Sequence, residues 1–161
     1  MAAKKKRKQP KTSLQKRKNN VNSGYWKKKC DAVWAEIIKT IDGHKCAVCG
    51  DPVRLNAHHL IDRSQLLTRY EIKNGIALCP LHHQFCRDMS AHKSPVRFSY
   101  WLFNEYPQRA LFVVHVKLDK KEDEEKKKRK FNYKEKLAEL EAILEDLQDT
   151  RVKLIPRIDG E

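Results

Sequence analysis

The 161-residue sequence contains no long hydrophobic run, and its first residues lack the apolar core of a signal peptide. A membrane-spanning helix needs about 20 consecutive apolar residues, so the first absence excludes a transmembrane protein. The second absence predicts that the protein stays in the cytoplasm, which is a reducing compartment. We therefore expect the five cysteines to be thiols that bind metal rather than a disulfide framework.

Acidic residues are absent from the first 30 positions, which carry twelve lysines and arginines. The formal net charge is +14, so the other 131 residues contribute only +2. Blocks of like charge repel and stay disordered, and dense Lys/Arg blocks are typical of nucleic-acid binding. We expect residues 1–24 to form a disordered basic arm that binds DNA. The run KKKRK at 4–8 also suits nuclear targeting, so the nucleus stays an alternative location in a eukaryote.

Apolar residues recur at three- and four-residue spacing directly after this arm. They are Trp26, Cys30, Val33, Trp34, Ile37, Ile38 and Ile41. The spacing predicts a helix with one apolar face, which ends at Asp42-Gly43 because this pair favours a turn. Two short apolar runs, 55–61 and 75–78, then predict two strands that are followed by a helix.

The second half of the chain shows three further segments. Ser94-Pro95 suits a helix start, so we expect a helix over 95–106 that ends before Pro107. The run 110–116 predicts a strand, which completes a domain over residues 25–116. Residues 117–130, KLDKKEDEEKKKRK, have no apolar face and predict a charged linker.

A C-terminal amphipathic helix is predicted over 131–150, with 151–161 as a tail. Its apolar seam consists of Tyr133, Leu137, Leu140, Leu144 and Leu147. The seam is only two heptads long, whereas a coiled coil usually needs three or four. We therefore favour packing of this helix onto its own domain in a monomer, with a dimer through the helix as the alternative.

Cysteine and histidine recur in pairs that have the spacing of zinc ligands. In Cys46-Ala-Val-Cys49, both thiolates can reach one tetrahedral Zn²⁺ at about 2.3 Å. Thirty residues later, Cys79-Pro-Leu-His82 offers a third thiolate and an imidazole. These four residues predict a structural zinc site, with Cys86 as the rival to His82. Because four protein ligands leave no open position for substrate, the catalytic chemistry is expected elsewhere.

The segment between the cysteine pairs contains His58-His59 and Asn74, and His83 follows the last zinc ligand. Fifteen residues lead from His59 to Asn74, and nine from Asn74 to His83. This pattern resembles the HNH nuclease family, whose ββα-metal motif has a His-His or Asp-His pair, a central Asn, and a His or Asn on the next helix. The resemblance covers Cys46 to Cys86, and the layout outside it is loosely similar to small phage-borne HNH proteins.

The resemblance implies a role for each of these residues. His59 is the general base that takes a proton from the attacking water. His58 and His83 hold a divalent cation, Mg²⁺ or another metal, against the scissile phosphate, and Asn74 fastens the loop that keeps His59 aimed. The implied products are a 5′ phosphate and a 3′ hydroxyl, and the implied location is the cytoplasm of a bacterium or of a phage-infected host cell.

Two positions depart from the family pattern. The second zinc knuckle usually ends in Cys, whereas this chain has His82. Some members place a third metal ligand where this chain has Arg87, which cannot bind a cation. Arg87 and Arg63 are candidates for phosphate contacts, with solvated surface arginines as the alternative. The remaining histidines, which lack ligand spacing and are interpreted as structural, are His44, His92 and His115.

The sequence as a whole predicts an α+β protein with an HNH ββα-metal core, stabilised by structural zinc and flanked by helices. The predicted function is metal-dependent nicking or cleavage of DNA, with double-stranded DNA as the expected partner. Two alternatives stay open: a zinc-stabilised module that binds nucleic acid without cutting, and an RNA nuclease. The basic arm does not separate DNA from RNA, because both present the same phosphate backbone.

Overall fold

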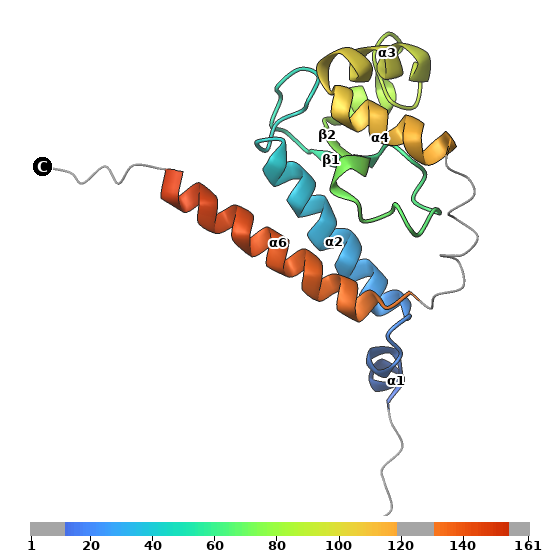
Figure 1. The fold of residues 1–161 in the computed structure, drawn as a ribbon, viewed down its shortest axis with the longest axis vertical. Helices are drawn as coiled ribbons and strands as arrows, with labels where there is room; N and C mark the ends of the chain where they lie inside the picture. Colours follow the sequence, from blue (N-terminus) through green and yellow to red (C-terminus); the bar gives the residue numbers. More distant parts are fainter. Residues whose placement is uncertain (1–11, 119–130, 155–161) are drawn as a thin grey trace, which may run out of the picture.

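The computed structural model describes residues 12–118 and 131–154. Along the chain the elements are α1 (Ser13–Asn19), α2 (Gly24–Ile41), β1 (Asn56–His59), η1 (Ile72–Asn74), β2 (Gly75–Leu78), η2 (Leu81–Phe85), α3 (Pro95–Glu105), α4 (Pro107–Leu118) and α6 (Tyr133–Leu154). Element η1 is a 3₁₀ turn, and η2 is a single turn of π-helix. Helices surround a two-stranded sheet, so the α+β class predicted from the sequence is confirmed (Figure 1).

The sheet lies directly on helix α2. Strands β1 and β2 pair antiparallel, with Asn56 opposite Leu78 and His59 opposite Gly75. Every residue of β2 is buried. A Cβ atom at Gly75 would lie 2.4 Å from the side chain of Ile38 and 2.8 Å from that of Trp34, so only glycine allows this close approach. Strand β1, which carries the histidine pair, is thereby held against α2.

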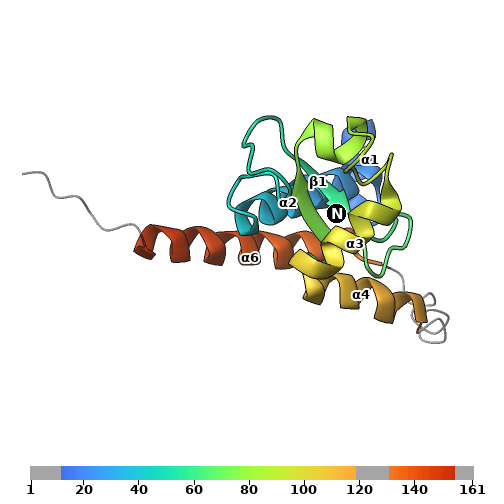
Figure 2. The ribbon, with the colours of Figure 1, turned by 90° about the horizontal axis from the view of Figure 1, so that it is seen from above.

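Helix α6 packs alongside α2, and its C-terminal turns extend beyond the rest of the domain (Figures 1 and 2). Tyr133, Leu137 and Leu140 are buried in a core shared with α2. At the start of α6, Sγ of the buried Cys30 donates to the carbonyl oxygen of Tyr133 at 3.1 Å, and burial raises the pKa of this thiol to about 11. The predicted packing of this helix onto its own domain is confirmed, whereas the monomeric state stays a prediction.

A second core lies on the other side of the sheet, and we call it the knuckle core. Its buried residues are Cys46, Ile76, Leu78, Cys79, Phe98, Leu102 and Ala110. It joins the two cysteine pairs to helices α3 and α4. The metal-binding segment therefore packs against the helices that follow it.

The strand predicted over 110–116 is wrong, because these residues belong to helix α4. The β-branched run suggested a strand, but three features of the structure favour a helix. Pro107 has the fixed φ that suits the first helical turn, Ala110 is buried in the knuckle core, and Arg109 bonds to Asp42 at the end of α2. These tertiary contacts override the local preference for a strand.

Part of the basic arm that composition predicts to be disordered is helical. Helix α1 begins after a capping box, in which Gln15 N–H donates to Thr12 Oγ1 and Thr12 N–H donates to Gln15 Oε1. Such a box satisfies two free N–H groups at a helix start. The rest of the predicted arm (1–11), most of the linker (119–130) and most of the tail (155–161) lie outside the described residues. None of the described helices has the length and apolar character that crossing a membrane requires.

A buried ion pair joins α4 to the end of α2. Arg109 Nη2 lies 2.6 Å from Asp42 Oδ1, and its Nη1 donates to Oδ2 at 3.1 Å. The same carboxylate accepts the backbone N–H of Ala77 at 2.7 Å, which ties β2 to both helices. The side chains of Arg109 and Asp42 are only 12% and 4% exposed, so each buried charge is stabilised mainly by the opposite charge of its partner.

We expect Arg109→Ala to lower the free energy of unfolding by about 3–5 kcal/mol, because it leaves the carboxylate of Asp42 buried without its counter-charge. The matched control is Arg97→Ala, which removes the exposed pair with Asp88 and is expected to cost about 0–1 kcal/mol. Urea denaturation followed by circular dichroism measures both. Equal losses in the two variants would contradict this role for the buried pair.

Candidate functional site

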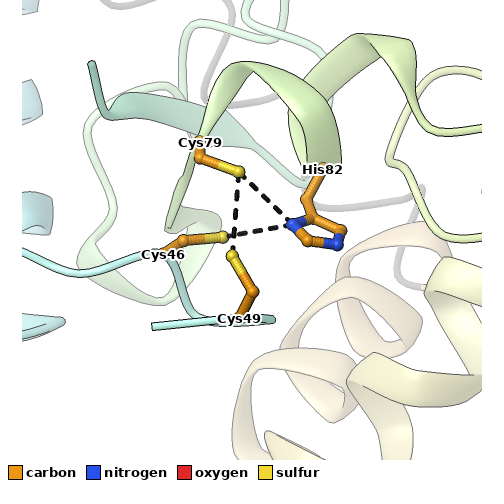
Figure 3. Close-up of side chains that lie close together, drawn as sticks. All are labelled: Cys46, Cys49, Cys79 and His82. Carbon is orange, nitrogen blue, oxygen red and sulfur yellow. Dashed lines mark hydrogen bonds between the residues drawn. The ribbon is translucent and has the colours of Figure 1, made fainter. Parts of the chain in front are cut away.

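Three thiols and one imidazole converge between the turn at 46–49 and the turn after β2 (Figure 3). The ligand atoms of Cys46, Cys49, Cys79 and His82 all lie within 4.8 Å of one another. The separations are 3.9 Å for Cys49 Sγ to Cys79 Sγ, 3.7 Å for Cys46 Sγ to His82 Nδ1, and 3.3 Å for Cys79 Sγ to His82 Nδ1. The structure thus brings together the four residues that the spacing predicts.

Backbone bonds hold the two halves of this cluster together. Cys46 N–H donates to the carbonyl of Asp51 at 2.8 Å, and Gly50 N–H donates back to the carbonyl of Cys46 at 2.8 Å, which closes a tight turn. Ala47 N–H donates to the carbonyl of Ala77 at 2.9 Å, so this turn is joined to β2. Cys79 follows β2 directly and His82 is the second residue of η2, which brings both to the same point.

The donor set fits a tetrahedral zinc ion. With Zn–S near 2.3 Å and Zn–N near 2.0–2.1 Å, tetrahedral ligands are about 3.8 Å apart for two sulfurs and about 3.6 Å for sulfur and nitrogen. The separations in the cluster lie around these values. Burial tends to raise the pKa of the Cys46 thiol, but backbone hydrogen bonds at Cys79, Cys49 and Val48 lower it overall, which favours the thiolate that binds metal.

Cys86, the rival fourth ligand, lies outside the cluster. Its Sγ accepts the backbone N–H of Met89 at 3.4 Å, and its carbonyl accepts the hydroxyl of Ser90 at 2.6 Å. It therefore stabilises the loop after η2. Of the two alternatives left open by the sequence, the geometry favours His82.

A second cluster contains three imidazoles and includes His83, the residue of η2 that follows His82. The ring centroids are 5.2 Å apart for His58 and His83, 5.2 Å for His58 and His92, and 4.9 Å for His83 and His92. One nitrogen from each ring lies within 4.8 Å of the other two, so this set can also hold a metal ion. The sequence predicts His58 and His83 as partners, and the structure brings them together.

His92, interpreted from the sequence as structural, lies in this second cluster, so it has imidazole partners that its spacing did not predict. Its distance along the chain from His83 matches no ligand spacing, and no sequence signal pointed to it. The loop returns across η2 because Ala91 N–H donates to the carbonyl of His82 at 3.0 Å. The buried Ser90 fixes this path, since its N–H donates to Ser94 Oγ at 2.7 Å.

Two of these imidazoles, His58 and His83, are neutral near pH 7. Burial, together with the nearby rings of His83, His92 and His59, lowers the pKa of His58 to about 3. Burial and the proximity of His92 also lower the pKa of His83. A neutral imidazole has a free lone pair, which is the form that binds a metal ion.

His59 points away from the imidazole cluster and stacks on Trp34 of α2. The two rings lie 3.9 Å apart at an interplanar angle of 16°. His59 Nε2 lies 3.0 Å from the carbonyl oxygen of Arg69. Because a carbonyl oxygen only accepts, Nε2 carries the proton and Nδ1 keeps its lone pair. Burial lowers the pKa of this ring, although the bond to Arg69 opposes the shift in part, so the lone pair is free near neutral pH.

The loop that carries the Arg69 carbonyl is fastened from two sides. Asn74 is fully buried: its Oδ1 accepts Ile61 N–H at 2.6 Å and its Nδ2 donates to the carbonyl of Thr68 at 2.9 Å. The guanidinium of Arg69 donates to both carboxylate oxygens of Asp31 at 2.9 and 2.8 Å. The sequence predicted the loop-fastening role of Asn74, but Trp34, Asp31 and Arg69 have no local signal and were missed.

A cavity of about 460 Å³ contains both His59 and the imidazole cluster in its lining. His58 and His59, although they alternate along β1, thus border the same space. Arg63 also lines this cavity, whereas Arg87 is exposed and lies outside the lining. The cavity therefore has three imidazoles that could hold a metal ion, the unprotonated nitrogen of His59, one cation, Arg63, and one carboxylate, Asp62. Searches against protein-family models, curated proteins and solved structures found no match to this chain.

Proposed function

We propose that this protein is a metal-dependent endonuclease that nicks or cleaves DNA, with an HNH-type site. One observation carries the proposal: a three-imidazole cluster and a separate neutral histidine, held by its Nε2, line one cavity. Hydrolysis of a phosphodiester bond needs a cation beside the phosphate and a base beside the attacking water. These two groups of residues supply both within a single space.

Three imidazoles without a carboxylate favour a transition metal over Mg²⁺ at this site. Mg²⁺ prefers oxygen ligands, whereas imidazole suits zinc, iron, nickel and copper ions. A bound divalent cation would neutralise charge on the phosphate and stabilise the leaving 3′ oxygen. His58, His83 and His92 would hold it on one side, so its remaining positions face the cavity.

The proposed general base is His59, acting through Nδ1. The carbonyl of Arg69 holds the proton on Nε2, and the Trp34 ring restricts rotation of the imidazole. A positioned base of this kind accelerates proton transfer from water by about 10²–10⁴-fold. Arg63, in the same cavity, is suited to a phosphate oxygen because its guanidinium can form paired hydrogen bonds.

The Cys46, Cys49, Cys79 and His82 cluster has a different proposed role. Four protein donors close a tetrahedral zinc, so the ion would stabilise the fold and take no part in cleavage. Two of the thiols belong to the knuckle core, and the neighbouring residues His82 and His83 of η2 belong one to each cluster. A zinc at this place would therefore also fix the position of His83.

DNA is the proposed substrate because the first 30 residues carry twelve cations and no acidic residue. An RNA nuclease is the alternative with the same phosphate chemistry. A module that binds without cutting is the second alternative, but simple binding requires neither a metal-ready imidazole cluster nor an oriented neutral base beside it.

Incubation of the purified protein with supercoiled plasmid tests this function. We expect conversion to nicked or linear forms with added Ni²⁺, Mn²⁺ or Zn²⁺, weaker conversion with Mg²⁺, and none without added metal. His92→Ala should raise the metal concentration needed for half-maximal cleavage at least tenfold. Loss of a residue that only hydrogen-bonds to a metal ligand already lowers metal affinity 10–100-fold. His115→Ala, on the exposed face of α4, is the matched control. No cleavage with any metal would contradict the proposal, and cleavage of RNA alone would favour the alternative.

A further inference from the structure

Helix α1 is fastened to the first turns of α2 by side chains of α2 and of the turn before it. Trp26 Nε1 donates to the carbonyl of Lys18 at 3.0 Å, and Ser23 Oγ donates to the carbonyl of Arg17 at 2.6 Å. Both bonds satisfy carbonyls at the C-terminal end of α1, where a helix leaves four acceptors without partners. We call residues 13–29 the basic corner, because α1 and the start of α2 form one unit there.

Every charged side chain of the basic corner is positive. They are Lys16, Arg17, Lys18, Lys27, Lys28 and Lys29. No acidic residue occurs between positions 12 and 30, and within residues 12–118 and 131–154 none of these six forms an ion pair. The amino groups of Lys18 and Lys29 lie 5.7 and 5.4 Å from the ring centre of Tyr25. Six unneutralised charges on one structured surface repel one another unless an anion binds there.

A hollow of about 440 Å³ opens on this surface, lined by Leu14, Arg17, Gly24, Tyr25 and Lys28. It combines two cations, one aromatic ring and a glycine backbone, and it contains no carboxylate. A backbone phosphate can pair with the cations while the nucleotide beside it packs on the aromatic ring. This combination is the one by which proteins bind a nucleic-acid strand without reading its sequence.

The hollow and the proposed active site are separate places along α2. Tyr25 and Trp34 are nine residues apart, which is about 14 Å along the helix axis and about two and a half turns, so they lie on opposite sides of the helix. Trp34 stacks on His59. The hollow is therefore distinct from the cavity that His59 lines.

We propose that the basic corner is a structured DNA-binding site, in which Arg17 and Lys28 pair with a backbone phosphate and Tyr25 packs on the adjoining nucleotide. The choice of DNA as the polyanion rests on the proposed function, but the binding itself needs neither His59 nor the imidazole cluster. The site is separate from the cavity that contains His59. It would give uniform affinity across sequences, since it contacts no base edge.

Fluorescence anisotropy of a labelled 20-base-pair duplex tests the site, with the His59→Ala protein and without added divalent metal, so that no cleavage interferes. Arg17→Ala with Lys28→Ala should weaken binding at low salt and reduce the magnitude of the slope of log K against log salt by about 0.9, the contribution of the one phosphate that both side chains contact. Lys45→Ala with Lys73→Ala removes the same charge from exposed positions away from the basic corner and should leave the slope nearly unchanged. Equal reductions in both double variants would overturn the proposal.

Two single variants test the remaining parts. On a 20-nucleotide single-stranded DNA, whose bases are free to stack, Tyr25→Leu should weaken binding about fivefold or more, because stacking of one base contributes at least about 1 kcal/mol. Trp26→Phe keeps the charge and a ring but removes the bond to the Lys18 carbonyl, so weaker binding is expected if α1 must be held in place. Unchanged affinity in both variants would overturn the structured site. Tighter binding to a 20-nucleotide RNA than to DNA, lost in the Arg17 and Lys28 double variant, would overturn DNA as its partner.

These outcomes are independent of the nuclease proposal. A wild-type protein that binds DNA through the basic corner but cuts no plasmid would contradict the endonuclease and leave this site intact. If the protein cleaves the plasmid but the basic-corner variants bind DNA as tightly as the wild type, the binding site would be contradicted and the endonuclease would stand. Zinc content and circular dichroism of each variant check that the fold is kept, which is expected because Arg17 and Lys28 are exposed.

Discussion

Cys46→Ser is expected to remove the zinc and to unfold the part of the domain that is built on the knuckle core. The serine hydroxyl does not replace a thiolate as a zinc ligand, and the apparent binding free energy of a structural zinc is about 10–16 kcal/mol. The stability of a whole small domain is only about 5–15 kcal/mol. Loss of the ion therefore removes as much free energy as the fold contains. Metal analysis after mild chelation, together with thermal unfolding, measures the effect.

Two variants make this experiment specific. Cys86→Ser should keep about one zinc per chain, because its sulfur accepts the N–H of Met89 and lies outside the cluster. His82→Ala should release the zinc. A folded, zinc-free Cys46→Ser protein would contradict the structural role of the site, and zinc loss in Cys86→Ser with retention in His82→Ala would reassign the fourth ligand.

His59→Ala is expected to lower the rate of DNA cleavage by about 10²–10⁴-fold, which is the contribution of a positioned general base. DNA affinity and zinc content should stay close to those of the wild type. The reason is that the base interacts with the attacking water in the transition state more strongly than with bound DNA. Single-turnover cleavage with saturating protein separates the chemical step from binding.

His44→Ala is the matched control for this variant, because His44 lies in the turn after α2 and contacts Thr40 rather than the cavity. It should cleave at the wild-type rate. Wild-type cleavage by His59→Ala would remove His59 from the mechanism. A loss of cleavage that is accompanied by loss of zinc would indicate that the variant damages the fold rather than the base.

Local patterns in the sequence predicted several elements because each pattern is a complete physical signal. The apolar face of α2, the Asp42-Gly43 turn and the Ser94-Pro95 start of α3 each depend on a few neighbouring residues. The two short strands and the turn after them lie where the apolar runs predict. The four zinc-type donors also come together, since paired spacing limits how two turns can meet around one point.

Helices α1 and α4 could not be predicted in this way. In α4 the β-branched run favours a strand, and the helix depends on contacts with Asp42 and the knuckle core, which are distant in sequence. In α1 the high charge favours disorder, and the helix depends on a capping box and on two bonds from Ser23 and Trp26. A prediction from local composition misses both helices, because composition does not reveal these few specific interactions.

By itself the sequence determined the α+β class and the paired cysteine and histidine donors. These follow from local patterns and spacing, because residues close in the chain or joined by a short turn have few ways to lie apart. The pairing of His58 with His83 and the loop-fastening role of Asn74 came from the resemblance to the HNH family. The tertiary structure alone decided that His92 completes the imidazole cluster and that Trp34 and the Arg69 carbonyl hold His59. These contacts join segments that are far apart in the chain, so their distances are set by the packing of the sheet on α2 and by the return of the loop across η2.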